Sequence, residues 1–554
     1  MHAFSSPSSP TDSSSILYNT STETMLGSIR ADFGSNNKDV IPQVIIGVIS
    51  VTLLSLIWLL PKKSKKTQTA PLPPGPYCLP LLGYIPFLDT HLCRCFTNLA
   101  AAHGPIFKLW LGTKMCVVVN SPEMMREVMR DKDQTFANRD PTISQRIFSH
   151  DGNDIAFAPY GADWRLLRKV FVRELLSNAN LDDSYALRRR EVRNAARTVY
   201  GKAGAPVDIG ELAFLTSFDA VTSMLWGGTL GAEEGKSFGS EFREVVMGIV
   251  GLVTKPNVSD FFPALARLDL QGIEKEMRKI MSHIDRIFDF ALDRRVKMDM
   301  GKRREGNGGE DGGKDFLQFL VELREQERAT GESITLMQTK AMLWDIVAAG
   351  TDTTATTVEW AMAEVMNHPE ILQKVHEELA SVVGPNNAVE ESHLSKLTYL
   401  NAVVKETLRL HPAFPFLIPH SPSETTVVGG YTIPKGTRVF INVWAVQRDP
   451  KIWPDPLEFR PDRFLGSDAG RMDYLGKNYH YLPFGSGLRI CAGLPLAERM
   501  TMHLVASFLH LFQWRLPEDA LKIDFEEKFG IVMKKAIPLV AIPTPKFSNS
   551  ELYE

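Results

Sequence analysis

The segment "PFGSGLRICAG", residues 483–493, constrains the fold of this chain more than any other feature. It places a single cysteine, Cys491, in a loop with three glycines. In the following "LPLAERMTMHLVASFLHLF", apolar side chains recur every four residues, which predicts a helix with one buried face. Pro495 is typical of a first helical turn. Cys491 therefore stands just before a helix N-terminus, where backbone N–H groups and the helix dipole are expected to lower the pKa of the thiol.

Three interpretations of Cys491 follow from this position. A nucleophilic cysteine usually has a histidine base, and the nearby His480, eleven residues away, has no evident route to the thiol. A thiolate ligand of haem iron agrees better with the loop. The third interpretation is a small buried cysteine without chemistry, which is the usual fate of a lone cysteine.

The residues around the cysteine have a fixed spacing, Phe484-x-x-Gly487-x-Arg489-x-Cys491-x-Gly493. This pattern resembles the haem-binding signature of the cytochrome P450 monooxygenases. The resemblance implies that Cys491 is the proximal ligand of the iron of haem b. It implies that Arg489 binds a haem propionate, that Phe484 packs near the thiolate, and that Gly487 belongs to the same cofactor-binding loop. The implied fold is mainly α (α+β), a large helical domain with small β-sheets and a single N-terminal transmembrane helix.

A long helix is predicted for "MLWDIVAAGTDTTATTVEWAMAEVMNHPE", which follows a possible capping box, Thr335-x-x-Gln338, and should end before Pro369. Its centre carries a glycine and five threonines, which are poor helix formers. Threonine hydroxyls can also bond back to helix carbonyls and bend the helix. One explanation is that small residues let another helix cross here. The family resemblance implies instead an oxygen-activating motif, in which Thr353 holds a water molecule and Asp352 relays protons.

Glu406 and Arg409 in "KETLRLHP" lie at i, i+3, on one face of a predicted helix. Alone they are typical of a surface ion pair. The resemblance implies that Arg463, in "FRPDRF", joins them in a buried triad. Such a triad is costly to break, and its implied role is structural, holding the loop that carries Cys491.

Trp164 and Arg168 are one helical turn apart. The resemblance implies that both contact a haem propionate and that His420 is a further propionate partner. Without it, a solvated arginine, a tryptophan at a helix start and a polar loop histidine are expected.

Arg165, Lys169 and Arg173 form a basic stripe with four-residue spacing. Such a stripe is usually a solvated face. The resemblance implies a docking face for an acidic electron-donor protein.

The sequence order predicts a polar, disordered N-terminal tail at 1–39 and a transmembrane anchor helix at 40–60, which contains no charge. A basic, proline-rich linker follows at 61–76, and the haem-thiolate catalytic domain is expected at 77–554. Lysines directly after the apolar span favour a cytosolic catalytic domain. We therefore expect a single-pass protein of the endoplasmic reticulum membrane, in contact with membrane lipid. A plastid transit peptide is the alternative, because the chain starts with a Ser/Thr-rich stretch.

Two short strands are expected on either side of Gly112-Thr113, followed by a helix from Ser121-Pro122. The segment "GGYTIPKGTRVFINVWAV" is predicted to form a hairpin that turns at Lys435-Gly436. Long helical stretches dominate the rest of the chain up to about residue 410.

The reaction implied by the resemblance is insertion of one oxygen atom from O₂ into a small lipophilic substrate. Electrons would come from NADPH through NADPH–cytochrome P450 reductase, because the chain has no flavin or dinucleotide fingerprint. A net charge of -3 gives no reason to expect nucleic-acid binding. The proline hinge, the haem loop and the C-terminal "EEKFGIVMKKAIPLVAIPTPK" resemble plant microsomal (A-type) members, near terpenoid and phenolic hydroxylases.

The expected substrate is a terpenoid, such as a sesquiterpene. The alternatives are a flavonoid or phenylpropanoid, a haem-thiolate isomerase or dehydratase acting without O₂, and a haem-binding scaffold without enzymatic activity. The Asp352-Thr353 pair argues against an isomerase, which needs no proton relay. By position in the family, the expected substrate pocket is apolar. It comprises Ile155, Ala349, Phe416, Leu417 and Ile531.

Overall fold

The computed structural model describes residues 70–227, 232–253, 255–305, 315–330, 334–466, 472–518, 520 and 522–554. All of them belong to one compact unit, Gln68–Glu554. The predicted tail at 1–39, the predicted anchor at 40–60 and most of the linker lie outside the described residues. Among the residues that are described, no helix combines the length and the apolar character needed to cross a bilayer.

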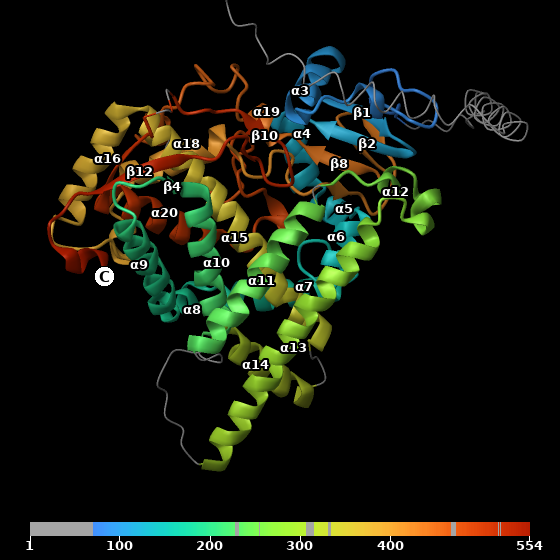
Figure 1. The fold of residues 1–554 in the computed structure, drawn as a ribbon. Helices are drawn as coiled ribbons and strands as arrows, with labels where there is room; N and C mark the ends of the chain where they lie inside the picture. The colour runs from blue at the N-terminus through green and yellow to red at the C-terminus, as the bar shows by residue number, and fades with distance from the viewer. Residues whose placement is uncertain are drawn as a thin grey trace, which may run out of the picture. The chain divides into compact units, whose positions relative to one another are not determined.

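The described body is mainly helical, as expected from the sequence (Figure 1). Its helices are α3 (Leu92–His103), α4 (Pro122–Arg126), α5 (Asp133–Phe136), α6 (Ile143–Phe148), α7 (Ala162–Lys169), α8 (Asn178–Asp183), α9 (Tyr185–Gly201), α10 (Ile209–Trp226), α11 (Ala232–Val253), α12 (Val258–Phe261), α13 (Ile273–Glu305), α14 (Phe316–Thr330), α15 (Leu336–Asn367), α16 (Pro369–Val382), α17 (Glu391–Leu394), α18 (Thr398–Leu410), α19 (Val443–Val446) and α20 (Leu494–Leu511).

The helix α15 runs through the middle of the body and packs against α10, α18 and α20 (Figure 1). Its predicted limits are confirmed. Thr335 and Gln338 form a capping box at its start, and the helix ends at Asn367, before Pro369. The hydroxyls of Thr353 and Thr357 donate to carbonyls four residues earlier, at 2.6 and 2.8 Å. The threonines therefore bond back to the backbone as expected, and the helix stays continuous through its weak centre.

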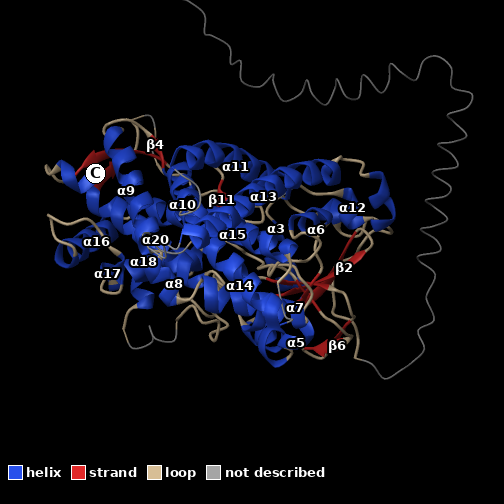
Figure 2. Ribbon diagram, turned by 90° about the horizontal axis from the view of Figure 1, so that it is seen from below, coloured by secondary structure: helices blue, strands red, loops and turns tan. Residues whose placement is uncertain are grey.

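The strands form small sheets, and Figure 2 shows β2 and β6 at one end of the body, β4 at the other and β11 between them. They are β1 (Ile106–Leu111), β2 (Lys114–Val119), β3 (Asn138–Arg139), β4 (Val207–Asp208), β5 (His420–Ser421), β6 (Thr426–Val428), β7 (Tyr431–Ile433), β8 (Arg438–Ile441), β9 (Phe512–Arg515), β10 (Glu527–Lys528), β11 (Lys534–Lys535) and β12 (Val540–Pro545). The largest sheet has the order β1-β2-β8-β5-β3, in which only β2 and β8 run parallel.

The predicted strands around Gly112-Thr113 are confirmed as β1 and β2, but the predicted hairpin at Lys435-Gly436 is wrong. β7 pairs with β6 across the turn at Gly429-Gly430, and β8 pairs with β2 and β5. In that position Val439 and Ile441 are buried in the same cluster as valines of β2. Burial of this apolar face decides the pairing over the nearby turn signal.

The edge of the large sheet also positions two polar side chains. In the antiparallel pair β3–β5, Arg139 lies directly opposite His420. Strands that are far apart in the sequence therefore bring a guanidinium and an imidazole to one place, next to the cavity described below.

Candidate active site

A cavity lies between α15 and the cysteine loop, and its empty volume is about 1550 Å³, part of it open to solvent. Most of the residues predicted for the site line it, although they come from segments far apart in the chain. These are Ile155, Arg168, Ala349, Thr353, Leu417, His420, Phe484, Arg489 and Cys491. The predicted Gly487 is not among the lining residues, although its neighbours Gly485 and Ser486 are. The cavity also has walls that the sequence did not single out, namely Arg139, Asp345 and Phe414.

Cys491 closes its loop by donating from its backbone N–H to the carbonyl of Phe484 at 2.9 Å. The residue is exposed, and the exposure is towards the cavity that it lines. Burial raises the pKa of the Cys491 thiol, although the backbone amides of Gly493 and Leu494 and the charge of Arg168 act in the opposite direction. The predicted lowering of this pKa is therefore wrong in sign, because the lost hydration outweighs the amides. A bound metal cation would deprotonate the thiol outright.

Gly487 explains why the loop needs glycine. Its φ is +67°, and a Cβ atom would collide with the Asp133 carboxylate and the Met129 carbonyl. The next amide, of Leu488, donates to Asp133 Oδ2 at 2.7 Å. Asp133, at the start of α5, thus docks the cysteine loop onto the rest of the fold, a contact that sequence reasoning missed.

Arg489 is buried beside the cavity, and its N–H groups donate hydrogen bonds to backbone carbonyl groups. Its Nε donates to Ala137 at 2.6 Å, and its Nη1 and Nη2 donate to Ile155 and Ala158 at 3.0 and 2.5 Å. Its guanidinium carbon lies 4.4 Å from the ring centre of Trp164. Trp164 itself donates to the Ile155 carbonyl at 3.0 Å, so the structure places it behind Arg489 and outside the lining of the cavity. Burial lowers the pKa of Arg489 to about 10.

Three further nitrogen-bearing side chains reach the cavity. Arg168 Nη2 donates to the Ile490 carbonyl at 2.6 Å. His420 bonds through Nδ1 to the Phe136 carbonyl at 2.9 Å, and burial together with Arg139 and Arg489 holds the pKa of His420 well below its usual range. Burial likewise holds the pKa of Arg139 well below its usual range, and Arg139 Nε is a buried donor without a partner.

These donors fit a haem. The Cys491 thiol faces the cavity from the helix end, and the side chains of Arg139, Arg168 and Arg489 line the same cavity. Buried charges need partners, and the orphaned Nε of Arg139 is such an unmet requirement. The two propionates of a haem would supply negative charge there, while Cys491 would hold the iron. Arg139 was missed from the sequence, although the stretch "FANRDP" contains it.

The predicted triad is assembled and buried. Glu406 receives hydrogen bonds from Arg409 at 2.7 and 2.8 Å and from Arg463 Nε at 3.2 Å. Arg409 also donates to the backbone carbonyl of Gln447 at 2.7 Å. The side chain of Gln447, a residue that sequence reasoning missed, in turn accepts from the amide of Leu482 at 3.0 Å. The triad is thereby connected to the segment that leads into the cysteine loop.

Asp352 and Thr353 point to different sides of α15. Thr353 lines the cavity. Asp352 is buried away from the lining and forms an ion pair with Lys534 of β11, at 2.5 Å between Oδ1 and Nζ. Of the two residues of the predicted relay, one therefore lines the cavity and the other pairs with a half-exposed lysine, and the relay itself stays a prediction.

Three of the five predicted pocket residues, Ile155, Ala349 and Leu417, line the cavity. Phe416 instead packs among aromatic side chains, with its ring 5.1 Å from that of Phe96. Ile531 is half-buried and is not among the lining residues. The segment after α18 still contributes to the cavity, through Phe414 and Leu417.

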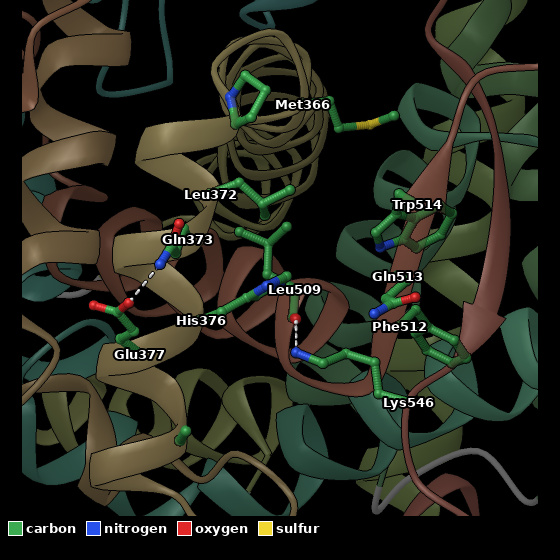
Figure 3. Close-up of a pocket in the computed structure, with 12 residues that line it drawn as sticks. Met366, Leu372, Gln373, His376, Glu377, Leu509, Phe512, Gln513, Trp514 and Lys546 are labelled. Atoms are coloured by element: carbon green, nitrogen blue, oxygen red, sulfur yellow. Dashed lines mark hydrogen bonds between the residues drawn. The ribbon is translucent and has the colours of Figure 1, made fainter.

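A second cavity, with an empty volume of about 1180 Å³ that is also partly open to solvent, lies between α16, the end of α20 and β9 (Figure 3). Met366, Leu372 and Trp514 line it, together with the polar residues Gln373, His376, Glu377, Gln513 and Lys546. None of the predicted site residues lines this second cavity. The chemistry is therefore assigned to the cavity at Cys491.

Comparisons with known proteins agree with this geometry. The family model described as Cytochrome P450 matches residues 73–540. The chain is similar to a flavonoid 3'-monooxygenase of Crocosmia x crocosmiiflora, with 37% identity over 90% of this chain and 98% of the relative. It is 38% identical to a flavonoid 3'-monooxygenase of Oryza sativa subsp. japonica, over 87% of this chain and 92% of the relative.

Among solved structures, the fold is similar to that of a zebra fish cytochrome P450 determined with abiraterone. The TM-score is 0.66 at 26% identity, and the match covers 82% of this chain and 99% of the other. Together with the cysteine loop and the cavity above it, these matches show that the chain belongs to the cytochrome P450 family, in its plant microsomal A-type group, and is a haem-dependent monooxygenase supplied with electrons by a reductase.

Proposed function

We propose that this monooxygenase hydroxylates a phenolic substrate of the flavonoid type. The observation that carries the proposal is the similarity, over about nine-tenths of the chain, to relatives named flavonoid 3'-monooxygenases. The cavity supports it, because Ile155, Phe414 and Leu417 give it an apolar wall suited to a flat lipophilic molecule.

Haem bound at Cys491 supplies the activation of O₂, which thiolate ligation favours. The chain's own residues orient the cofactor and manage protons. Arg139, Arg168 and Arg489 would hold the propionates. Thr353 donates its hydroxyl proton to the Ala349 carbonyl, so its lone pairs remain free to accept from a water molecule in the cavity. Asp352, paired with Lys534 near the surface, would pass protons inward when that pair opens.

A terpenoid such as a sesquiterpene is the second candidate substrate. The apolar wall favours it equally, since Ile346, Ala349 and Leu417 offer no hydrogen bond. A change of one methyl group in such a wall alters preference by only about 1–3 kcal/mol, so the wall alone does not separate the two classes.

The proposed setting is the endoplasmic reticulum membrane, with the anchor at 40–60 and the catalytic domain in the cytosol. The proposed electron donor is NADPH–cytochrome P450 reductase. Arg165 and Lys169 on α7, and Arg173 in the π-helical turn Val170–Leu175, are exposed and offer it a basic docking face.

The test is a substrate panel. The full-length chain in membranes, with plant reductase and NADPH, is given flavones, flavanones and sesquiterpenes, and products one oxygen atom heavier are measured by mass spectrometry. We expect turnover of the flavonoids. Turnover of the sesquiterpenes alone would replace the first candidate by the second, and NADPH-independent conversion of a hydroperoxide would favour an isomerase.

A further inference from the structure

The α15 wall of the cavity contains a buried carboxyl group that the mechanism above does not use. Asp345 lies one helical turn before Ala349 and two turns before Thr353, and it lines the cavity although it is only 5% exposed. A second carboxyl group, of the fully buried Asp154, lies next to it in the chain segment between α6 and α7.

The hydrogen bonds show that backbone amides, and not cations, satisfy the two groups. Asp345 Oδ2 accepts from the amide of Ile155 at 2.8 Å. Asp154 Oδ1 accepts from the amides of Phe157 and Ala158 at 2.9 and 3.0 Å, and its Oδ2 is buried without a partner. No ion pair to Asp154 or Asp345 is found in the described part of the chain. Neighbouring buried carboxyl groups cannot both be charged without a large electrostatic cost.

Asp345 is the member of the pair that keeps its proton. Burial, and then the charge of Asp154, hold the pKa of Asp345 well above its usual range. Asp154 is also raised by burial, to a pKa of about 6, but its two amide donors and Arg489 favour its charged form. Asp345 accepts one backbone amide and Asp154 accepts two, so the proton of the pair belongs on Asp345, which is then an O–H donor. With Oδ2 held by Ile155, the proton belongs on Oδ1, the oxygen without a hydrogen bond among the described residues.

We propose that Asp345 sets the specificity of this enzyme by donating a hydrogen bond from its carboxyl group to an oxygen atom of the substrate. The ligand chemistry is a neutral, flat lipophilic molecule with a hydroxyl, ether or ketone oxygen at the end remote from the carbon that is oxidised. This inference rests on the proposed function, because it names the feature by which a flavonoid would be held.

The placement of Asp345 also explains how one donor can fix the site of oxidation. At about 1.5 Å per residue, Asp345 and Thr353 are separated by about 12 Å along the axis of α15. A molecule of three rings can reach from one to the other. Between them the wall offers the apolar side chains of Ile346 and Ala349, so the orientation of the substrate depends on the single polar contact at Asp345. A ligand that lacks the oxygen leaves a buried donor unpaired, which costs affinity.

The experiment measures ligand binding, without turnover, by optical titration of the oxidised full-length holoenzyme. The ligands are a hydroxylated flavone with its deoxy analogue, and a sesquiterpene ketone with its parent hydrocarbon. The proteins are the wild type, Asp345→Asn, Asp345→Leu and the matched control Ile346→Val, a change in an adjacent wall residue that offers no hydrogen bond.

In the wild type, we expect the oxygenated member of a pair to bind about tenfold or more tightly than its partner. Asp345→Asn keeps an acceptor for Ile155 and gains an amide donor, so it should keep most of this ratio. Asp345→Leu should reduce the ratio to about one, and Ile346→Val should shift both ligands of a pair alike.

Three outcomes would overturn the inference. The wild type could show no preference for the oxygenated member of either pair. Asp345→Leu could weaken both members equally, which is the mark of a structural role in holding Ile155. Asp345→Leu could also keep the wild-type ratio. A preference seen only with the terpenoid pair would contradict the flavonoid proposal and still support the role of Asp345. If Asp345→Leu does not fold, as judged by its carbon monoxide difference spectrum, Asp345→Ala replaces it, because that variant also removes the donor, and a wild-type ratio in Asp345→Ala would overturn the inference.

Discussion

The two sides of the cavity are built in different ways. On the cysteine side, one continuous stretch, residues 483–493, supplies the thiol, the arginine and the glycine that lets the loop approach Asp133. On the α15 side, the wall combines one face of a helix with the segment around Ile155 and the segment after α18. The first side is determined by local sequence and steric necessity, and the second by tertiary packing. The reaction type can therefore be inferred from the sequence more readily than the substrate.

The largest expected effect is on the cysteine side. Cys491→Ala removes the only thiol among the described residues that line this cavity. We expect it to abolish the red-shifted band in the carbon monoxide difference spectrum of the reduced protein, together with all monooxygenase activity. Cys95→Ala, at a half-buried position in α3, is the control and should retain both. A thiolate-type band that survives in Cys491→Ala would contradict the assigned ligand.

The next prediction tests how much the buried triad around Glu406 contributes to the stability of the fold on the cysteine side. Glu406→Gln leaves the guanidinium of Arg409 buried without its carboxylate partner, and we expect the free energy of unfolding to fall by about 3–5 kcal/mol. Denaturant titration measures this, and haem content should fall with it. The control, Glu191→Gln, loses a pair with the exposed Arg190 and should cost no more than about 1 kcal/mol. Equal losses in the two variants would show that the triad has no special role.

The smallest effect is expected on the α15 side, where Thr353→Ala removes one hydroxyl from the wall. Substrate should bind as before, because the apolar wall is unchanged, but proton delivery should be impaired. We expect a severalfold increase in hydrogen peroxide released per NADPH consumed. Fully coupled turnover by Thr353→Ala would count against the relay.

Lys534→Met frees Asp352 on the opposite face of the helix, and it should alter the solvent isotope effect on turnover without affecting substrate binding.

The sequence predicted those features that depend on near neighbours. The capping box at Thr335, the end of α15 before Pro369 and the strands around Gly112 were all foreseen, because each is a local signal. The hairpin at Lys435-Gly436 was not formed, because β8 gains more by burial beside β2.

The residues missed at the site share one property: each acts on a segment distant in the chain. Asp133 holds the amide of Leu488, Gln447 holds that of Leu482, and Asp345 holds that of Ile155. No spacing rule predicts a contact between a carboxylate or amide side chain and a backbone group that lies 35, 190 or 355 residues away, as in these three cases. Arg139 could have been noticed in "FANRDP", but only the pairing of β3 with β5 shows that it meets His420.

The side chain of Gln447 has a consequence for how the protein should come apart. Its amide nitrogen donates to the carbonyls of Leu408 and Arg409 at the end of α18, while its oxygen receives the amide of Leu482. One residue thus joins the end of α18 to the segment that leads into the haem-binding loop. On heating, the loss of haem absorbance should therefore follow the same melting curve as the loss of near-ultraviolet circular dichroism. No partly unfolded intermediate that still holds haem should be populated.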